Sequence, residues 1–288
     1  MVIKVVKNDG SVDYFDKSKI MQSCMRAGAT YELAEKIASE VENEIYDGIT
    51  TKEIMKKVKE KLRKYKVEKV YIKYPLKDAL ALLDPEFHEF EHFVAKLFTY
   101  LGYDAQRSPY PHPEGFCVDH EIDVLLRNNK GYGIVECKHH YKQKKLTNLG
   151  VVMRQWARLM DFREAHRRHN SIDVKEAWVV TNTKFTYHAI KYSKCKRVYL
   201  LGWNYPPNKG INHLIEKYKA YPLTLFNIKP SIRKELLEKE NVIDANDLLR
   251  LSDDKLKHYF RDNYKKIKKK IITIIAAQEG DNDHQKNN

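Results

Sequence analysis

Two acidic residues and a lysine stand at the ends of neighbouring apolar runs in the stretch HEIDVLLRNNKGYGIVECKHH, residues 120–140. The runs at 122–126 and 132–137 are rich in Ile, Val and Leu, and the five residues between them, Arg-Asn-Asn-Lys-Gly, predict a hairpin turn. Side chains alternate along a strand, so Glu136 and Lys138 point to one face and Cys137 to the other. The hairpin brings Asp123 beside them.

This set of charges suggests chemistry on a phosphate. Two carboxylates that converge at the margin of a buried sheet repel each other and lose hydration, and a divalent cation such as Mg²⁺ or Mn²⁺ removes that cost. Lys138 would then position a water or stabilise charge that develops on a phosphate. The same spacing also fits a hairpin whose three charges simply face solvent.

The segments around the hairpin predict an α/β core that positions these side chains. Upstream, apolar residues recur at helical spacing and predict an amphipathic helix that ends near Gly102. Downstream, residues 151–162 predict a helix, 177–181 a strand, 186–195 a helix and 197–203 a strand. The apolar positions of the upstream helix are Phe87, Phe90, Val94, Leu97 and Phe98.

The spacing from Asp123 through twelve residues to Glu136-Cys137-Lys138 resembles the D…ExK signature of the PD-(D/E)XK nucleases. The segment EFHEFEHFVAKLFTYLGYDAQRS, with its Phe-Glu helix followed by Leu-Gly-Tyr, resembles the opening of Mrr-type members of that restriction-endonuclease-like family. The resemblance covers roughly residues 85–223. It implies a Mg²⁺- or Mn²⁺-dependent DNA endonuclease in which Asp123 and Glu136 hold the metal, Lys138 orients a water and Glu91 supplies a further carboxylate.

A second group of polar residues surrounds this signature. Arg158 and Asp161 match the "AR..D" of one branch of endonuclease-like proteins, and Gln155 lies one turn earlier on the same expected helix. With His120 and Glu121 these residues form a candidate secondary site. A solvated helix face with one ion pair is the alternative.

The first 80 residues predict a separate unit. A hairpin with its turn at residues 8–10 is followed by helices at 17–27, 31–46 and 51–65. The unit resembles the ATP-cone, the regulatory nucleotide-binding module of ribonucleotide reductases and of their transcriptional repressor. The matching features are V-x-K-x-D-G with Val5 and Lys7, the FDKSKI that places Lys19, and Asp-Gly-Ile-Thr-Thr, which brings Thr51 to a helix start.

The resemblance implies that ATP or dATP binds this unit. Lys7 and Lys19 would contact phosphates, and Thr51 stands where free helix amides favour an anion. Asn8 replaces a residue that is usually basic, and Pro75 interrupts the segment where the last helix normally continues. These departures predict a weakened affinity or an altered base preference.

The last 65 residues are helical and basic. Pro230, then Asp244 or Asn246, and Ser252 mark three helix starts, and a lysine-rich amphipathic helix follows before a polar tail. This pattern loosely resembles small helix-hairpin-helix modules that hold a nucleic-acid backbone. A packing or dimer-forming bundle is an equal alternative.

The composition favours a polyanionic partner. The 288 residues carry 53 Lys and Arg against 39 Asp and Glu, a net charge of +14. No apolar run approaches the roughly 20 residues of a membrane span, so a cytoplasmic protein is expected. The four cysteines lack CxxC spacing, which argues against a structural zinc and a disulfide framework.

The sequence therefore predicts a multi-domain α/β protein. Its expected parts are an ATP-cone made of a small hairpin plus helices at 1–82, a restriction-endonuclease-like α/β core at 83–223, a small helical module at 224–276 and a disordered tail at 277–288. The expected function is a nucleotide-regulated endodeoxyribonuclease, acting as a homo-oligomer in restriction or defence. The alternative is a nucleotide-responsive DNA-binding protein or repressor with an inactive nuclease fold.

Overall fold

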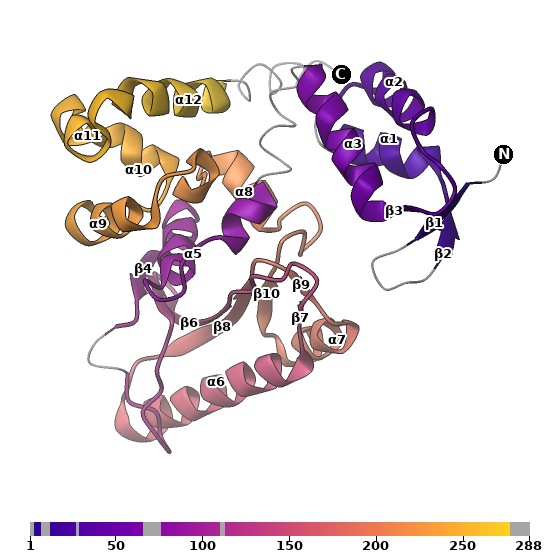
Figure 1. Ribbon diagram of the computed structural model, residues 1–288. Coiled ribbons are helices and arrows are strands. Elements are labelled where there is room, and N and C mark those ends of the chain that lie inside the picture. Colours follow the sequence, from indigo (N-terminus) through magenta and orange to yellow (C-terminus); the bar gives the residue numbers. More distant parts are fainter. Residues whose placement is uncertain (1–2, 7–11, 27–28, 66–75, 110–112, 277–288) are drawn as a thin grey trace, which may run out of the picture. The chain divides into compact units, whose positions relative to one another are not determined.

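The computed structural model describes residues 3–6, 12–26, 29–65, 76–109 and 113–276 (Figure 1). The expected turn at 8–10, Lys7, Pro75 and the C-terminal tail lie outside the described residues, so the expectations for them stay predictions. The chain divides into two compact units, residues 1–75 with 269–288 and residues 76–268. Whether the boundaries at 82 and 223 delimit independent domains stays a prediction as well.

The first unit has the hairpin and the three helices that the sequence predicts. β1 pairs antiparallel with β2 and parallel with β3, a strand that the sequence did not predict. The helix expected to reach residue 46 ends at Glu42, because the chain must turn back for β3: Gly48, with φ +84°, donates its N–H to the Lys4 carbonyl at 2.9 Å. The elements are β1 Lys4–Val6, β2 Val12–Tyr14, α1 Lys17–Arg26, α2 Tyr31–Glu42, β3 Ile49–Thr50 and α3 Thr51–Lys64.

A mixed five-stranded sheet forms the centre of the second unit, in the order β10-β8-β6-β5-β4. β6 pairs antiparallel with β5, as the predicted hairpin requires, and parallel with β8 on its other side. The edge strand β4 was not predicted, because its four residues carry only one apolar side chain. The strands are β4 Asp104–Arg107, β5 Val124–Asn128, β6 Gly131–Lys138, β8 Val174–Thr181 and β10 Tyr199–Leu201.

Helices cover both faces of this sheet. Figure 1 shows the sheet between α5 (Glu89–Tyr100) and α6 (Leu149–His169). Phe98 of α5 packs edge-on against Trp178, whereas the neighbouring Ala177 and Val179 pack in the core formed with α6, as the alternation of a strand requires. α7 (Tyr187–Lys196) lies beside α6, and a short parallel pair joins β7 (Leu146–Thr147) to β9 (Lys184–Phe185).

The C-terminal helices begin where the sequence predicts. Pro230 is the first residue of α9, and the side chains of Asp244 and Ser252 cap α10 and α11. A 3-10 turn, Leu223–Phe226, precedes α9. The helices are α8 Ile211–Tyr218, α9 Pro230–Glu240, α10 Ala245–Arg250, α11 Asp253–Phe260 and α12 Tyr264–Ala276.

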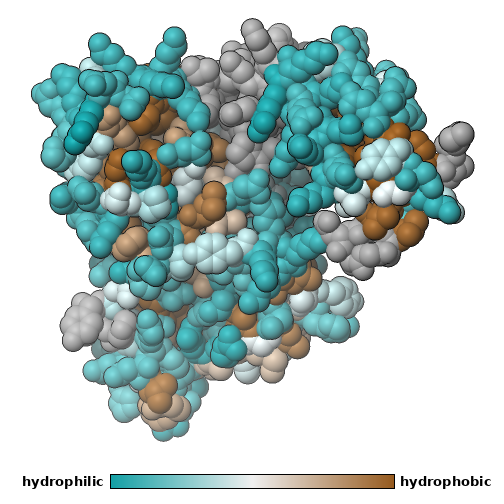
Figure 2. Space-filling model, viewed as in Figure 1, coloured by the Kyte–Doolittle hydropathy of each residue, from teal (hydrophilic) through white to brown (hydrophobic). Residues whose placement is uncertain are grey.

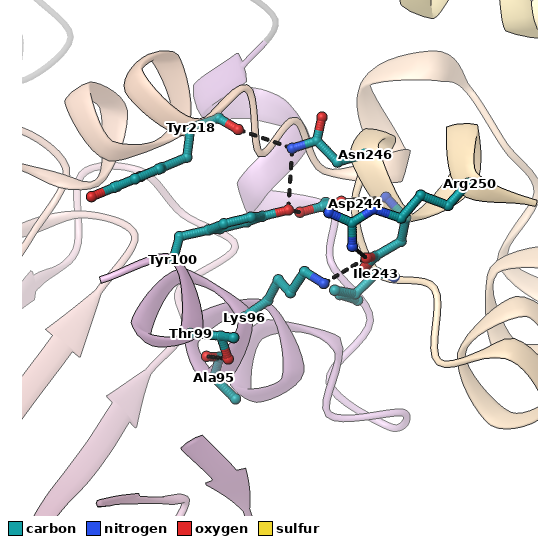
Figure 3. Close-up of polar contacts among 10 residues, drawn as sticks. Ala95, Lys96, Thr99, Tyr100, Tyr218, Ile243, Asp244, Asn246 and Arg250 are labelled. Carbon is teal, nitrogen blue, oxygen red and sulfur yellow. Dashed lines mark hydrogen bonds and ion pairs between the residues drawn. The ribbon is translucent and has the colours of Figure 1, made fainter. Parts of the chain in front are cut away.

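Polar contacts join the C-terminal helices to α5 (Figure 3). Tyr100 donates its hydroxyl hydrogen to Asp244 at 2.8 Å, and Lys96 forms an ion pair with Asp247 at 2.5 Å. The amide of Asn246 donates to the Tyr100 hydroxyl and to the Tyr218 carbonyl. Residues about 150 positions apart in sequence are thus held by one network.

A buried ion pair forms a second link between the same elements. Arg233 of α9 donates to both carboxylate oxygens of Glu89, at 2.9 and 3.1 Å, and to the Ile228 carbonyl at 2.8 Å. Glu89 is 1% exposed and also accepts the N–H of Asp84 at 2.7 Å. Because every partner is hydrogen-bonded, the pair is tolerated in the interior.

The stability of this unit is expected to fall as the pH rises through the titration of Asp244. Burial, followed by the nearby charge of Asp247, raises the pKa of Asp244 from its ordinary 3.8 to about 6. A raised pKa means that the folded state holds the proton more tightly, so the stabilisation is complete below pH 3.8 and is lost as the pH passes 6. The difference in unfolding free energy between the parent and Asp244→Asn should therefore fall by up to about 3 kcal/mol from pH 4 to pH 7. Urea unfolding across this range measures it, and a constant difference would contradict the assignment.

The outer surface is mostly polar. On the face shown in Figure 2, hydrophilic residues predominate and hydrophobic ones appear as scattered patches. Among the helices that the structure describes, none is long and apolar enough to cross a membrane. All four cysteines are free.

Candidate active site

The end of the β5–β6 hairpin brings Asp123 and Glu136 together. Val124 is the register partner of Val135, so Asp123, one residue before β5, comes opposite Glu136. The Cys137 N–H donates to Asp123 Oδ2 at 2.6 Å, which fixes that carboxylate at the strand edge. Glu136 and Lys138 lie on one face of the strand, as the sequence predicts, since they pair with each other.

Glu136 lies between two cations. Its Oε1 is 2.5 Å from Lys138 Nζ, and its Oε2 forms an ion pair with Arg158 of α6. The carboxylate is only 6% exposed, and burial alone would raise its pKa. Lys138 and Arg158 outweigh burial and lower the pKa of Glu136, so it is ionised at neutral pH.

Asp123 has the opposite electrostatic character. Burial, together with the charges of Glu136 and Glu91, raises its pKa to about 6 against the opposing effects of the Cys137 amide and Lys138. Its hydrogen-bond donor among the described residues is a backbone amide, which brings no full positive charge. A carboxylate that is short of positive charge beside a second one is a suitable ligand for a divalent cation.

The residues present fit such a cation as an open site. The described part of the chain contains no cluster of three His, Cys, Asp or Glu side chains able to hold a metal unaided. Mg²⁺ is usually bound through one or two carboxylates, with waters and substrate phosphates completing its shell. Asp123 and Glu136 supply that number of carboxylates, provided that one Glu136 oxygen is released by its cation.

Glu91 stands near this pair on α5. His88 Nδ1 and Arg107 Nη1 approach its Oε2 at 3.0 and 3.4 Å, and its charge contributes to the raised pKa of Asp123. Arg107, on the unpredicted strand β4, was not identified from the sequence. Nothing in its local pattern marks it, because it reaches the site only through the β4–β5 pairing.

The candidate secondary site separates into different places. Arg158 belongs to the primary site through Glu136, and Gln155, one turn earlier, donates to the Ile134 carbonyl at 3.0 Å. The side-chain oxygen of Gln155, Oε1, is buried without a hydrogen-bond partner among the described residues. His120 is 2.8 Å from Asp161, whose other oxygen accepts the Cys117 N–H, and this contact anchors the segment before β5.

The last member of that group is Glu121, which is exposed. The structure thus brings Arg158 to the catalytic candidates and gives His120 and Asp161 an anchoring contact. Glu121 makes no recorded contact with either group.

The nucleotide-binding candidates differ in their exposure. Val5 is 5% exposed in the hydrophobic core of the first unit, so its side chain is not available to a ligand. Lys19 is well exposed, and its Nζ lies 3.5 Å from Asp13. Thr51 is the first residue of α3, but Thr50 and Glu53 form a capping box there and already satisfy part of the helix start.

A mixed sheet between two helices, with carboxylates and a lysine at the end of its hairpin, defines the restriction-endonuclease-like class of α/β protein. Residues 83–202 match the family described as restriction endonuclease, of the Mrr type, and residues 3–78 match the ATP cone domain. The chain therefore carries an ATP-cone domain at residues 3–78, followed by a restriction endonuclease domain at residues 83–202.

The chain is also similar to individual proteins. It is 33% identical over 164 residues to an uncharacterized protein of Archaeoglobus fulgidus, which covers 57% of this chain and 88% of that one. It is 40% identical over 70 residues to the transcriptional repressor NrdR of Caldicellulosiruptor saccharolyticus, which covers 22% of this chain and 46% of the repressor. A crystal structure of a protein of unknown function aligns with a TM-score of 0.54 and 28% identity, covering 67% of this chain and 99% of that one.

Proposed function

We propose that the protein is a Mg²⁺- or Mn²⁺-dependent endonuclease that hydrolyses DNA phosphodiester bonds, under the control of ATP or dATP. The observation that carries the proposal is the meeting of Asp123, Glu136 and Lys138 at one hairpin end, where Asp123 lacks a cationic partner of its own. The net charge of +14 supports a polyanionic substrate. Restriction or defence is the setting that we propose for this activity.

The side chains divide the work as follows. Asp123 and Glu136 hold the divalent cation, which when bound supplies positive charge to the scissile phosphate and acidifies a water. Lys138, partly exposed beside Glu136, orients the attacking water and contacts the phosphate. Glu91 adds negative charge next to Asp123 and is positioned by His88 and Arg107.

A cleavage assay tests the proposal. Supercoiled, linear and single-stranded DNA are incubated with the full chain in Mg²⁺, Mn²⁺ or EDTA, each with ATP, with dATP and without nucleotide. Metal-dependent cleavage that EDTA abolishes is the expected result. No cleavage of any substrate in either metal would reject the enzyme.

A DNA-binding protein or repressor with an inactive nuclease fold is the second candidate. The contact that favours it is the Arg158 ion pair, because Arg158 and Lys138 together already neutralise Glu136. In that case DNA binding would respond to nucleotide while EDTA and Mg²⁺ made no difference. The similarity of this chain over 70 residues to a transcriptional repressor is in line with such a role.

Nucleotide binding is expected to depend on the lysines of the ATP-cone. Replacing Lys7 and Lys19 together by alanine should lower the affinity for ATP or dATP, because each charge-assisted phosphate contact contributes roughly 1.5–3 kcal/mol, or about one to two decades. Titration calorimetry measures the affinity. Lys56→Ala removes an exposed lysine from α3 and is the matched control. Unchanged affinity in the double variant would reject the assignment.

Nucleotide is further expected to act by changing the oligomeric state. A ligand that binds one assembly better than another shifts the population toward it, and a dimer offers two active sites for two strands. Light scattering without nucleotide, with ATP and with dATP gives the mass, and cleavage rates are measured under the same conditions. A constant mass with a changing rate would exclude this mechanism.

A further inference from the structure

The chain that leaves Lys138 forms a surface next to the candidate active site. Residues 139–147 follow the carboxyl end of β6, and residues 182–187 follow the carboxyl end of the neighbouring strand β8. The two segments are fastened together by Asn182, which exchanges hydrogen bonds with the backbone N–H and carbonyl of His140 at 2.9 and 2.8 Å. The β7–β9 pair extends the contact, so the surface is built from ordered backbone.

Four exposed lysines lie on these two segments. None of them has an ion-pair partner within the part of the chain that the structure describes, in contrast to Lys138. Lys184 of β9 is the register partner of Leu146, and Lys145 immediately precedes Leu146, so Lys145 lies close to Lys184. The four are Lys142, Lys144, Lys145 and Lys184.

Electrostatic effects on neighbouring groups connect these cations into one stripe. Burial lowers the pKa of His140, and the charges of Lys145 and Lys138 lower it further. Burial and the charge of Lys184 likewise lower the pKa of Lys77. Positive charge is therefore present from Lys138 across the loop to Lys184 of β9, and the acidic Asp78 contacts this loop at Gln143 rather than at one of the four lysines.

Large apolar side chains stand among the lysines. Tyr141 is 59% exposed, Tyr187 is 71% exposed and Leu146 is 45% exposed. The Thr186 N–H donates to the Thr147 carbonyl at 3.0 Å, which places Tyr187 next to the end of β7. Two tyrosine rings thus remain largely exposed to solvent, at a cost in apolar exposure.

We propose that this surface binds an unpaired strand of DNA, whose phosphates contact the lysines and whose bases stack on Tyr141 and Tyr187. Paired DNA presents its bases only as edges within the grooves, so free aromatic rings gain nothing from it, whereas a single strand offers base faces for stacking. Asp84 and Glu86 lie near Tyr141 and, after burial, raise its pKa. Their negative charge disfavours a phosphate beside them, so the DNA backbone is expected to follow the lysines instead.

The inference rests on the proposed function for what happens next to Lys138, since it makes the substrate a DNA with a single-stranded segment at the cleavage site. Binding itself does not depend on cleavage. The two ideas can therefore be tested in separate arms of one experiment.

Fluorescence anisotropy of a labelled 30-nucleotide strand and of the matching duplex, in EDTA with the full chain, measures binding alone. The parent is expected to bind the single strand more tightly than the duplex. Tyr141→Ala and Tyr187→Ala should each lower single-strand affinity by roughly 5- to 100-fold while leaving duplex affinity within about twofold. Lys145→Ala with Lys184→Ala should weaken binding and reduce its dependence on salt.

The controls are residues of the same type elsewhere. Tyr31→Ala removes an exposed tyrosine from α2, and Lys191→Ala with Lys194→Ala removes two exposed lysines from α7. Circular dichroism and thermal unfolding identify any variant that fails to fold, and Tyr141→Phe, which keeps the ring, should restore single-strand affinity.

Unchanged single-strand affinity in both tyrosine variants, or an equal loss on duplex and single strand, would overturn the inference. Mg²⁺ and Mn²⁺ are then added to the same complexes. Selective single-strand binding without cleavage would refute the nuclease but leave this surface assigned, whereas cleavage of duplex alone with no tyrosine effect would refute the surface and keep the nuclease.

Discussion

Replacing Asp123 by asparagine or Glu136 by glutamine is expected to lower DNA cleavage on the order of 10³-fold or more. Each change removes a carboxylate that would hold the cation, and that cation contributes several kcal/mol to stabilising charge in the transition state. DNA affinity should stay within about twofold, because the basic surface is unchanged. The amides retain the shape of the side chains, and glutamine still offers Arg158 an acceptor, so the fold should be preserved.

Glu121→Gln provides the matched control. It removes one negative charge two residues from Asp123, but its side chain is exposed and no contact of it with the site is recorded. Cleavage by this variant should remain within about twofold of the parent. Near-parental cleavage by Asp123→Asn or Glu136→Gln in Mg²⁺ would show that the site lies elsewhere.

Arg233→Met is expected to destabilise the second unit by roughly 3–5 kcal/mol. The substitution leaves the Glu89 carboxylate buried without its cation, which is the costly way of breaking a buried pair. Urea unfolding followed by tryptophan fluorescence measures the effect. All three tryptophans of the chain, at 156, 178 and 203, lie in this unit, so the signal reports its unfolding alone.

Two further variants test the reason for this loss. Lys234→Met removes the neighbouring, half-buried lysine, which lies over the Phe87 ring, and should change stability by less than about 1 kcal/mol. Glu89→Gln combined with Arg233→Met removes both charges and should recover much of the loss, because no charge stays buried and unpaired. If Arg233→Met and Lys234→Met lowered the unfolding free energy by the same amount, the buried ion pair would not be the cause of the loss.

The local pattern of the sequence was sufficient for the hairpin of the active site. Alternation placed Glu136 and Lys138 on one face, and the turn length placed Asp123 opposite them, because both depend only on neighbouring residues. The same local signals identified Pro230, Asp244 and Ser252 at helix starts. The segment YKQKK directly after His140 could have indicated the lysine surface, but it was not singled out.

Features that depend on distant residues were not predicted. The pairing of Arg158 with Glu136 requires α6 to pack on the sheet at one particular position along β6. Nothing in the sequence of either segment specifies that position. The pairing of Arg233 with Glu89 joins positions 144 residues apart, and a basic helix with a buried arginine looks in sequence like any solvated helix. The two-residue strand β3 is too short to leave a pattern, although its pairing with β1 shortens α2.

Helix α5 limits how far the catalytic part of this protein can be shortened. The same twelve residues carry Glu91, beside the proposed catalytic carboxylates, and Glu89, Lys96 and Tyr100, which bind the C-terminal helices. A fragment that stopped at residue 223 would retain every proposed catalytic group yet lose Arg233, Asp244 and Asp247. For protein engineering, the shortest self-sufficient catalytic fragment should therefore run through α11 to residue 260, and fusion partners should be attached beyond that point.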